Sequence, residues 1–247
     1  MDNNNLNKEL YSKELFKVWS EKKGLLPTEE YLIHKYLVNK NAKIIEAGTG
    51  GGRIIFEIEK LGFRKLEAFD YVDGMVESCR VQKNKINSKI EFNIADATNL
   101  FKYKTAEFDY LIYLQQILCF VSKDLFEQSL QEAHRIGKGH SIYLFSFLNW
   151  DSKKYNPLLS KLVNFFRSLR NEKTSKYQLP WLILDRKFNW KLFNSNQPQN
   201  LWFKKKYIAK VLNDNGFQII ELKTGGEILG NKNSNNGQLY IVCRQNN

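Results

Sequence analysis

Three acidic side chains and a cluster of glycines are the residues of this chain best suited to chemistry. The glycines are Gly48, Gly50, Gly51 and Gly52, and they follow Glu46 and a short apolar run. Apolar residues resume afterwards at helical spacing, so the sequence predicts a strand, a tight turn and a helix. Glycines let a ligand approach the backbone, and amides at the start of a helix favour a carboxylate or phosphate. The turn is therefore a candidate anion-binding site, with a glycine-rich turn that binds nothing as the alternative.

Two aspartates follow the next two predicted strands. Asp70 ends the predicted strand 65–70, 22 residues after Gly48, and Asp96 follows the predicted strand 90–94. A nucleotide-binding α/β domain holds a carboxylate near the first position, because a carboxylate can accept hydrogen bonds from both ribose hydroxyls. Ligands of open α/β sheets bind at the carboxyl ends of the strands. We therefore expect Glu46, Asp70 and Asp96 to lie along one edge of a sheet.

The spacing of the glycines separates two kinds of cofactor site. A dinucleotide fingerprint requires G-x-G-x-x-G, but the sixth position counted from Gly48 is Arg53. The segment from Glu46 to Gly52 instead reads acidic-x-Gly-x-Gly-x-Gly, and a second acidic motif follows at 69–75. In these motifs the chain resembles the class I S-adenosylmethionine-dependent methyltransferases. A nicotinamide-dependent dehydrogenase is the alternative, against which Arg53 argues.

The resemblance implies a site for S-adenosyl-L-methionine, with S-adenosyl-L-homocysteine as the product. It assigns the amino-acid end of the cofactor to the glycine turn, the ribose to Asp70, and the adenine to Asp96 and the amide of Ala97. The apolar run 108–114 resembles the family's fourth motif, after which Gln115 and Gln116 would face the transferred methyl. The cofactor-binding residues implied by the resemblance are Glu46, Ala47, Gly48, Thr49, Gly50, Arg53, Asp70, Tyr71, Met75, Asp96, Ala97, Leu114 and Gln115.

The order of the predicted elements indicates an α/β fold. Helices and apolar strands alternate through residue 147, which requires a parallel sheet with right-handed crossovers. A glycine- and asparagine-rich loop between the predicted strands 217–222 and 238–243 is typical of an antiparallel hairpin. Together with the resemblance, this gives a three-layer, Rossmann-like, seven-stranded sheet that is mostly parallel, with an antiparallel last strand. We expect residues 41–148 and 204–247 to form this methyltransferase domain.

Two further segments complete the predicted organisation. Residues 1–40 contain two predicted helices, at about 8–21 and from Thr28 onward, and in the family such a segment lies over the cofactor. Residues 149–203 form a basic, aromatic-rich insertion, a candidate substrate lid with a helix beginning at Asn156 and Pro157. Packed aromatics and a solvated lysine-rich surface are the alternatives to a binding role. The candidate substrate-binding residues are Tyr11, Trp19, Gln116, Trp181 and Arg186.

Composition and charge restrict the classes of molecule that the chain is expected to bind. The chain is 43% hydrophobic, which is typical of globular proteins, and no apolar run reaches the about 18 residues of a membrane span. Its beginning is unlike a signal peptide, so we expect a cytoplasmic protein. The net charge is +12, and residues 150–206 hold 13 Lys or Arg against 3 acidic residues. This charge favours a small, anionic acceptor over nucleic acid or a membrane surface, because neither an RNA-binding module nor a long amphipathic helix is evident.

Methyl transfer requires little of the protein's own side chains. The cofactor carries the electrophile, so the protein supplies orientation and a dry site for an O or N nucleophile. The three histidines, His34, His134 and His140, lie in no recognisable catalytic motif, so we name no general base and leave the catalytic residues unassigned. The three cysteines are far apart and lack metal-ligand spacing, so we expect no metal site. A cofactor-binding sensor or assembly subunit, and a methyltransferase of RNA or protein, remain as alternatives.

Overall fold

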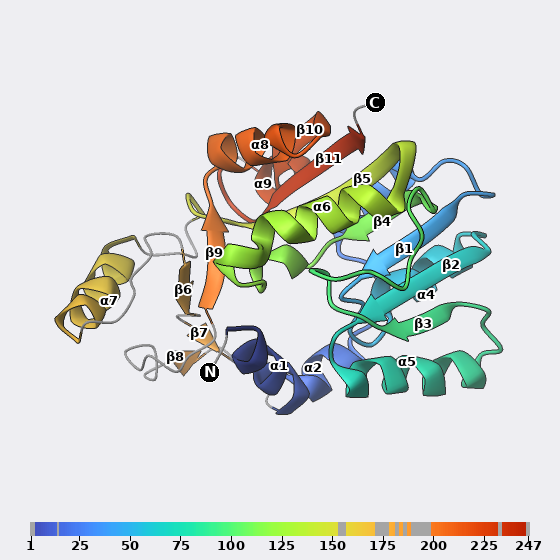
Figure 1. The fold of residues 1–247 in the computed structure, drawn as a ribbon, viewed down its shortest axis with the longest axis horizontal. Helices are drawn as coiled ribbons and strands as arrows, with labels where there is room; N and C mark the ends of the chain where they lie inside the picture. The colour runs from blue at the N-terminus through green and yellow to red at the C-terminus, as the bar shows by residue number, and fades with distance from the viewer. Residues whose placement is uncertain are drawn as a thin grey trace.

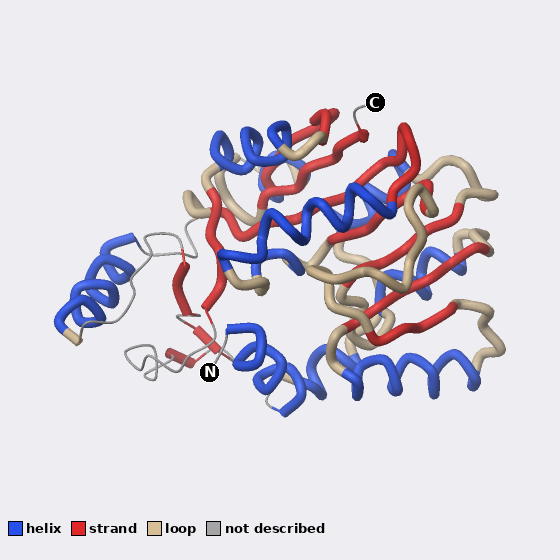
Figure 2. Tube along the Cα trace, in the orientation of Figure 1, coloured by secondary structure: helices blue, strands red, loops and turns tan. Residues whose placement is uncertain are grey.

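A computed structural model of the 247-residue chain describes residues 3–13, 15–152, 157–170, 178–180, 183–184, 187–188, 199–231 and 234–245. Its centre is a mixed sheet in the order β10-β11-β5-β4-β1-β2-β3 (Figures 1 and 2). The parallel strands are β1 (Lys43–Ala47), β2 (Lys65–Asp70), β3 (Glu91–Ile94), β4 (Phe108–Tyr113) and β5 (Gly137–Asn149). The edge strand β10 (Phe217–Thr224) pairs antiparallel with β11 (Leu239–Gln245), which is also antiparallel to β5. The predicted Rossmann-like α/β fold is therefore confirmed.

Helices cover both faces of the sheet and make it the middle of three layers. On one face lie α6 (Phe126–Ile136) and α8 (Lys205–Asp214), and on the other α3 (Pro27–Tyr36), α4 (Arg53–Lys60) and α5 (Asp73–Lys85). Successive residues of a strand point to opposite faces. Ile44 accordingly packs in the core cluster that includes α3 and α4, and Ile45 packs in the cluster that includes α6 and α8.

Short elements complete the sheet edges and the loop after β4. The 3₁₀ helices η1 (Ile117–Cys119) and η2 (Lys123–Leu125) connect β4 to α6, and α9 (Gly225–Ile228) lies between β10 and β11. The helix α8 ends at a glycine, because Gly216 takes the left-handed φ of +84° just beyond the helix.

The amino-terminal helices differ from the prediction in their bounds. The single helix predicted at about 8–21 is two helices, α1 (Asn3–Lys13) and α2 (Phe16–Glu21). The next helix begins at Pro27 with Leu26 as its N-cap, so Thr28 lies inside the helix and is not its cap. The Thr28 hydroxyl instead donates to the hydroxyl of Tyr240 (2.8 Å), which ties α3 to β11.

Part of the predicted insertion extends the sheet. β9 (Gln199–Phe203) pairs in parallel with the end of β5, and antiparallel with β6 (Gln178–Pro180). Leu201, Trp202 and Phe203 are buried in the main core, which explains why this segment is a strand. The small strands β7 (Ile183–Leu184) and β8 (Lys187–Phe188) pair with each other. The helix α7 (Pro157–Leu169) begins at the predicted proline, whereas Asn156 lies outside the described residues.

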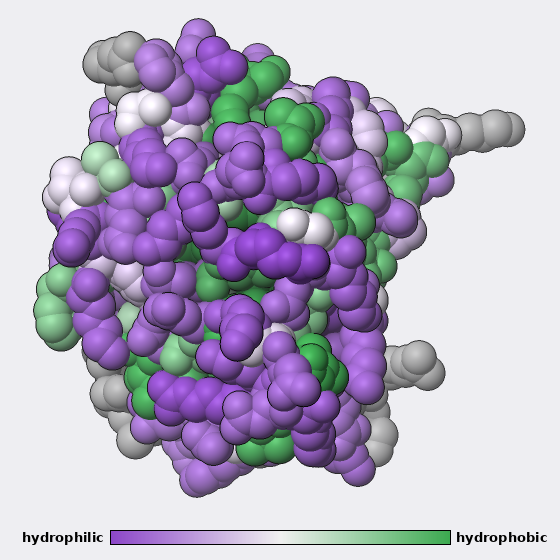
Figure 3. Space-filling model, turned by 90° about the vertical axis from the view of Figure 1, so that its right-hand side faces the viewer, coloured by the Kyte–Doolittle hydropathy of each residue, from purple (hydrophilic) through white to green (hydrophobic). Residues whose placement is uncertain are grey.

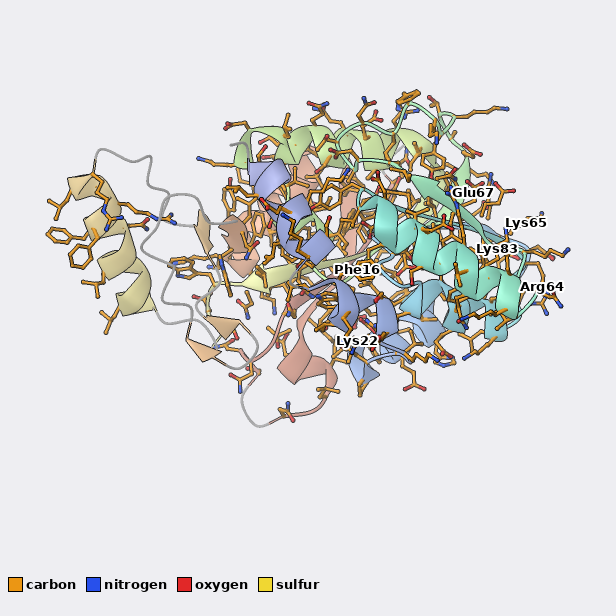
Figure 4. The ribbon with its side chains drawn as sticks, turned by 90° about the horizontal axis from the view of Figure 1, so that it is seen from below. Phe16, Lys22, Arg64, Lys65, Glu67 and Lys83 are labelled. Atoms are coloured by element: carbon orange, nitrogen blue, oxygen red, sulfur yellow. The ribbon has the colours of Figure 1, made fainter. Side chains whose placement is uncertain are left out.

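The two ends of the parallel strands differ in character. Figure 3 views the molecule from the amino ends of the strands, and this face is largely hydrophilic. Arg64, Lys65 and Lys83 lie at this end, together with Glu67, whereas Phe16 and Lys22 of the amino-terminal segment lie nearer the opposite end (Figure 4). The carboxyl ends of the strands therefore face the side on which the amino-terminal helices pack.

Candidate active site

A cavity that is open to solvent lies at the carboxyl ends of the parallel strands, and residues from α1 and α2 cover it. Ten of the sequence-predicted site residues line it, namely Tyr11, Trp19, Gly48, Gly50, Asp70, Tyr71, Met75, Asp96, Ala97 and Gln115. Residues that the sequence did not single out complete the wall, chiefly Ile117, Phe120 and Val121 from the segment after β4. Open α/β sheets bind their ligands at this edge.

Six predicted residues lie beside the cavity without being among its lining residues. They are Glu46, Ala47, Thr49, Arg53, Leu114 and Gln116. Trp181 and Arg186 fall outside the described residues, so the structure does not place them. The predicted site thus divides into a group that faces the ligand space and a group that supports it.

The glycine turn packs closely against neighbouring segments, and four of its backbone amides already donate hydrogen bonds within the protein. The amides of Thr49, Gly50, Gly51 and Gly52 donate to Phe69 O, Asp70 Oδ2, Trp19 O and Thr49 O respectively. The expectation that these four amides would be available to an anion is therefore wrong, because strand β2, Trp19 of α2 and the turn itself already accept hydrogen bonds from them. Gly48 has a φ of +60°, and a Cβ there would lie 2.3 Å from Cδ1 of Ile117.

Asp70 is buried and is held by the backbone around it. Its Oδ1 accepts from the amide of Val72 and its Oδ2 from the amide of Gly50, both at 2.9 Å. Burial raises the pKa of the carboxyl, and the backbone hydrogen bonds oppose that rise. A carboxylate has about four lone-pair positions, so two further donors can be accepted in the cavity. Asp70 is therefore a fixed hydrogen-bond acceptor in the lining of the cavity.

Asp96 and Tyr71 add two polar groups that face the same space. Oδ1 of Asp96 accepts from both the amide and the hydroxyl of Thr98, each at 2.9 Å, while Oδ2 has no hydrogen-bond partner among the described residues. The Tyr71 hydroxyl is also buried without a partner in the described part of the chain. Burial raises the pKa of this hydroxyl, so it stays a neutral donor and acceptor. Buried polar atoms without partners are rare and indicate a ligand or water at the site.

Glu46 joins the strand, the turn and the helix of the first motif. Its Oε2 accepts from the hydroxyl of Thr49 (2.6 Å) and from the amide of Ile55 (3.1 Å). Burial raises the pKa of this carboxyl to about 8, against hydrogen bonds that lower it. Glu46 therefore holds the glycine turn and the start of α4 in place, and the glycine turn in turn forms part of the cavity wall.

Glu29 is the residue that sequence reasoning missed. Its carboxylate receives a two-pronged hydrogen bond from Arg53 (2.6 and 2.7 Å), and both side chains are buried. Arg53 also donates to the carbonyl of Gly24 (2.6 Å). Glu29 lies in the first turn of α3, where an acid is favoured by the helix dipole alone, so nothing about its position in the chain indicated this pairing.

Gln115 is oriented by the same carboxylate. Its Nε2 donates to Oε1 of Glu29 (2.9 Å), and since a carboxylate only accepts, the amide cannot turn the other way. Oε1 of Gln115 is then the atom left for another donor, and the residue lines the cavity. Gln115 and Gln116 both have positive φ, at +65° and +61°, so the turn after β4 is strained.

The amino-terminal segment forms an aromatic wall over the cavity. The ring of Tyr11 meets that of Phe120 edge to face, with centroids 5.3 Å apart, and Nδ2 of Asn7 donates to the carbonyl of Phe120 (2.9 Å). Among the described lining residues, Asp70 and Asp96 are the only charged side chains. No group of three metal-ligating side chains occurs in the part of the chain that the structure describes. This wall favours an apolar or flat molecule.

Comparison with known proteins agrees with this geometry. Residues 44–139 match a family model described as a methyltransferase domain, and no curated protein matches the chain. Among solved structures, the Burkholderia thailandensis 1,6-didemethyltoxoflavin N1-methyltransferase, with its acceptor and S-adenosylhomocysteine bound, is 14% identical with a TM-score of 0.66, covering 98% of this chain and 86% of that one.

Two more structures show the range of chemistry found on this fold. Magnesium protoporphyrin IX methyltransferase from Synechocystis PCC 6803, with S-adenosylhomocysteine bound, is 14% identical with a TM-score of 0.64, covering 99% of this chain and all (100%) of that one. The cyclase SpnF is 10% identical with a TM-score of 0.66, covering 98% of this chain and 97% of that one. At these identities the likeness is one of fold, and the reaction has to be argued from the site.

Proposed function

We propose that this chain transfers a methyl group from S-adenosyl-L-methionine to an O or N nucleophile of a small molecule, because residues 44–139 match a methyltransferase domain. S-adenosyl-L-homocysteine is the product. The observation that carries the proposal is the convergence of Asp70, Asp96 and the Gly48 turn on one cavity at the carboxyl ends of neighbouring strands.

The residues present fit this cofactor. Asp70 would accept from the ribose hydroxyls with its remaining lone pairs, and Oδ2 of Asp96 would accept from the adenine amino group. The Tyr71 hydroxyl, buried without a partner among the described residues, gives a further polar contact. When bound, the cofactor supplies a positively charged sulfonium that carries the methyl group.

The chain's own contribution is to orient the acceptor and to exclude water. Tyr11, Trp19, Ile117 and Phe120 form an apolar wall, and Oε1 of Gln115 is free to accept a hydrogen bond from the nucleophile. The described lining contains no histidine, lysine or cysteine, and we assign no residue of it as a general base. Two of the similar structures are named for methyl transfer to small heterocyclic molecules, which supports a small acceptor.

Residues 149–203 are proposed as the substrate lid. The structure contains the strands β6 and β9 of this segment beside the end of β5, on the side of the cavity. Any anionic group of the acceptor would have to be held by this basic segment, because the described cavity wall carries only negative charge. A cofactor-binding sensor is the second candidate, favoured by the absence of histidine, lysine and cysteine from that described wall. Labelled cofactor incubated with cell extract distinguishes the two, since only an enzyme labels an acceptor.

Calorimetry with S-adenosyl-L-homocysteine tests the cofactor site. We expect wild type to bind, and Asp70→Asn to bind at least about tenfold more weakly, because hydrogen bonds to a charged acceptor contribute about 1.5–3 kcal/mol each. The matched control is Asp73→Asn, since Asp73 is exposed at the start of α5 and pairs with Lys8 on the surface (3.1 Å). No binding by wild type, or equal binding by both variants, would refute the assignment.

A further inference from the structure

The helix α7 carries an apolar face that points to solvent. Leu158, Leu162, Phe165 and Leu169 are 74%, 45%, 58% and 66% exposed. They are spaced by four, three and four residues, so they form one stripe along a helix of 13 residues, about 20 Å long. Apolar side chains gathered on one exposed stripe mark an interaction surface, whereas single exposed ones do not.

The location of α7 separates it from the core of the molecule. Figure 1 shows it standing apart from the sheet, on the side toward which the parallel strands point, and Figure 4 shows the same separation from below. None of the helices in the described part of the chain is long and apolar enough to cross a membrane. Contact with a lipid bilayer would therefore be made by a helix lying on its surface.

The charged residues of the described segment 157–170 are all basic, and Arg167 among them is buried. Lys161 and Arg170 are exposed on the helix and at its end. The sequence 153–176, which contains α7, has seven Lys or Arg residues and one acidic residue. A short helix with an aromatic and leucine face, flanked by basic residues, has the composition of helices that lie in the interface of anionic bilayers.

We propose that α7 docks on an anionic lipid surface, with its stripe of Leu158, Leu162, Phe165 and Leu169 in the acyl boundary and its exposed basic residues, Lys161 and Arg170, at the headgroups. A second copy of the chain is a poorer occupant, because an isologous contact would bring two equally basic segments together. A single helix face is also small for a stable protein interface, which buries about 800 Å² on each partner. An anionic bilayer can bury the apolar stripe at its acyl boundary, and its headgroups attract the basic residues.

Docking in this way would also set the orientation of the enzyme. The carboxyl ends of the strands, where the cavity lies, are on the same side as α7 (Figure 1). A helix anchored in the interface would hold the cavity near the bilayer, where apolar molecules concentrate. The aromatic wall of the cavity suits an acceptor of that kind, and this last step rests on the proposed function, whereas the docking does not.

Flotation of the full-length chain with lipid vesicles tests the proposal. Vesicles of phosphatidylcholine alone are compared with vesicles that also contain phosphatidylglycerol. We expect wild type to float with the anionic vesicles only. The double variant Leu162→Ser, Phe165→Ser should bind at least about tenfold more weakly, because each buried apolar side chain contributes about 1.5–3 kcal/mol. Lys161→Gln should reduce binding about fivefold.

Control variants and further measurements distinguish loss of lipid binding from misfolding and from failure of the proposed function. Phe101→Ser removes another exposed aromatic, 79% exposed and far from α7 in sequence, and should leave flotation unchanged. Circular dichroism confirms that each variant is folded, and cofactor calorimetry reports separately on the proposed function. Absence of flotation, or flotation that survives the double substitution, overturns the proposal. Sedimentation that shows a dimer lost in the double variant would assign the stripe to a second copy instead.

Discussion

Gly48 is the point at which the turn after β1 meets the segment after β4. Its φ of +60° and the 2.3 Å that would separate a Cβ from Ile117 both exclude larger residues. We expect Gly48→Ala to lower the free energy of unfolding by about 2–4 kcal/mol, from left-handed strain and from displacement of Ile117. Displacing Ile117 also narrows the cavity, so S-adenosyl-L-homocysteine should bind more weakly.

Gly62→Ala is the control for this substitution. Gly62 has a φ of +96°, but no atom lies within 4 Å of the position that its Cβ would take. Only the backbone strain applies there, and the expected loss is about 1–2 kcal/mol with unchanged ligand binding. Urea denaturation and calorimetry of the two variants measure both effects. Equal losses of stability and binding in the two variants would contradict a special role for the contact with Ile117.

At the scale of elements, the buried pair Glu29–Arg53 links α3 to α4 and, through Gln115, to the loop after β4. Glu29→Gln leaves the guanidinium of Arg53 buried without a charged partner. We expect this substitution to lower the free energy of unfolding by about 3 kcal/mol. Glu30→Gln, one residue further along α3, changes an exposed side chain 3.9 Å from His34 and should have almost no effect.

Activity measurements can separate the positioning role of Glu29 from its effect on stability. In Glu29→Gln, residue 29 can donate as well as accept, so the Gln115 amide can bind it through either Nε2 or Oε1. The Oε1 of Gln115 then no longer has a fixed orientation in the cavity. At a temperature where both proteins are folded, we expect a lower kcat with little change in affinity for the cofactor. The double variant Glu29→Gln, Arg53→Met should recover part of the stability. Full activity in Glu29→Gln would contradict the proposed role of Gln115.

At the scale of the whole molecule, Glu221 joins the amino-terminal helices to the last hairpin. Its carboxylate on β10 accepts from the hydroxyls of Tyr31 (2.9 Å) and Tyr36 (2.6 Å) of α3. It also pairs with Lys223 (2.7 Å) and Lys35 (3.1 Å). Burial would raise the pKa of Glu221, but these hydrogen bonds outweigh burial and lower the pKa to about 2.

A lowered pKa gives a defined dependence of stability on pH. The contribution of Glu221 is present above the pKa of an unfolded Glu, about 4.3, and is lost as pH falls toward 2. We expect wild type to lose about 2 kcal/mol more than Glu221→Gln between pH 6 and pH 2.5. Denaturation curves at several pH values measure this difference. If the free energy of unfolding falls equally with pH in the two proteins, Glu221 is not a principal acid-sensitive group.

Local patterns account for what could be predicted from the sequence. The alternation of helices and apolar strands determines the sheet, and carboxylates at the ends of parallel strands must share an edge. For this reason Asp70 and Asp96 could be expected at one edge, where both line the cavity. Helix ends were harder to predict, because Pro27 and Thr28 both carry starting signals and the tertiary contact of Thr28 with Tyr240 decides between them.

Contacts between distant segments could not be predicted. Glu29 and Arg53 are 24 residues apart, and Tyr31 and Glu221 are 190 apart, so no spacing rule connects them. The amides of the glycine turn looked free in the sequence because the strands and helices that occupy them come from elsewhere in the chain. β9 was assigned to an insertion because its burial against β5 depends on tertiary packing.

The contact of Gly51 with the amino-terminal segment has a kinetic consequence. The amide of Gly51 donates to the carbonyl of Trp19 (3.2 Å), and a Cβ on Gly51 would lie 2.4 Å from the carbonyl oxygen of Ser20. The motif that we propose to receive the cofactor therefore also contacts the amino-terminal helices that cover the cavity. The cofactor product can leave most directly when the amino-terminal helices move away from the glycine turn. We therefore expect product release, and not methyl transfer, to limit the rate of successive turnovers.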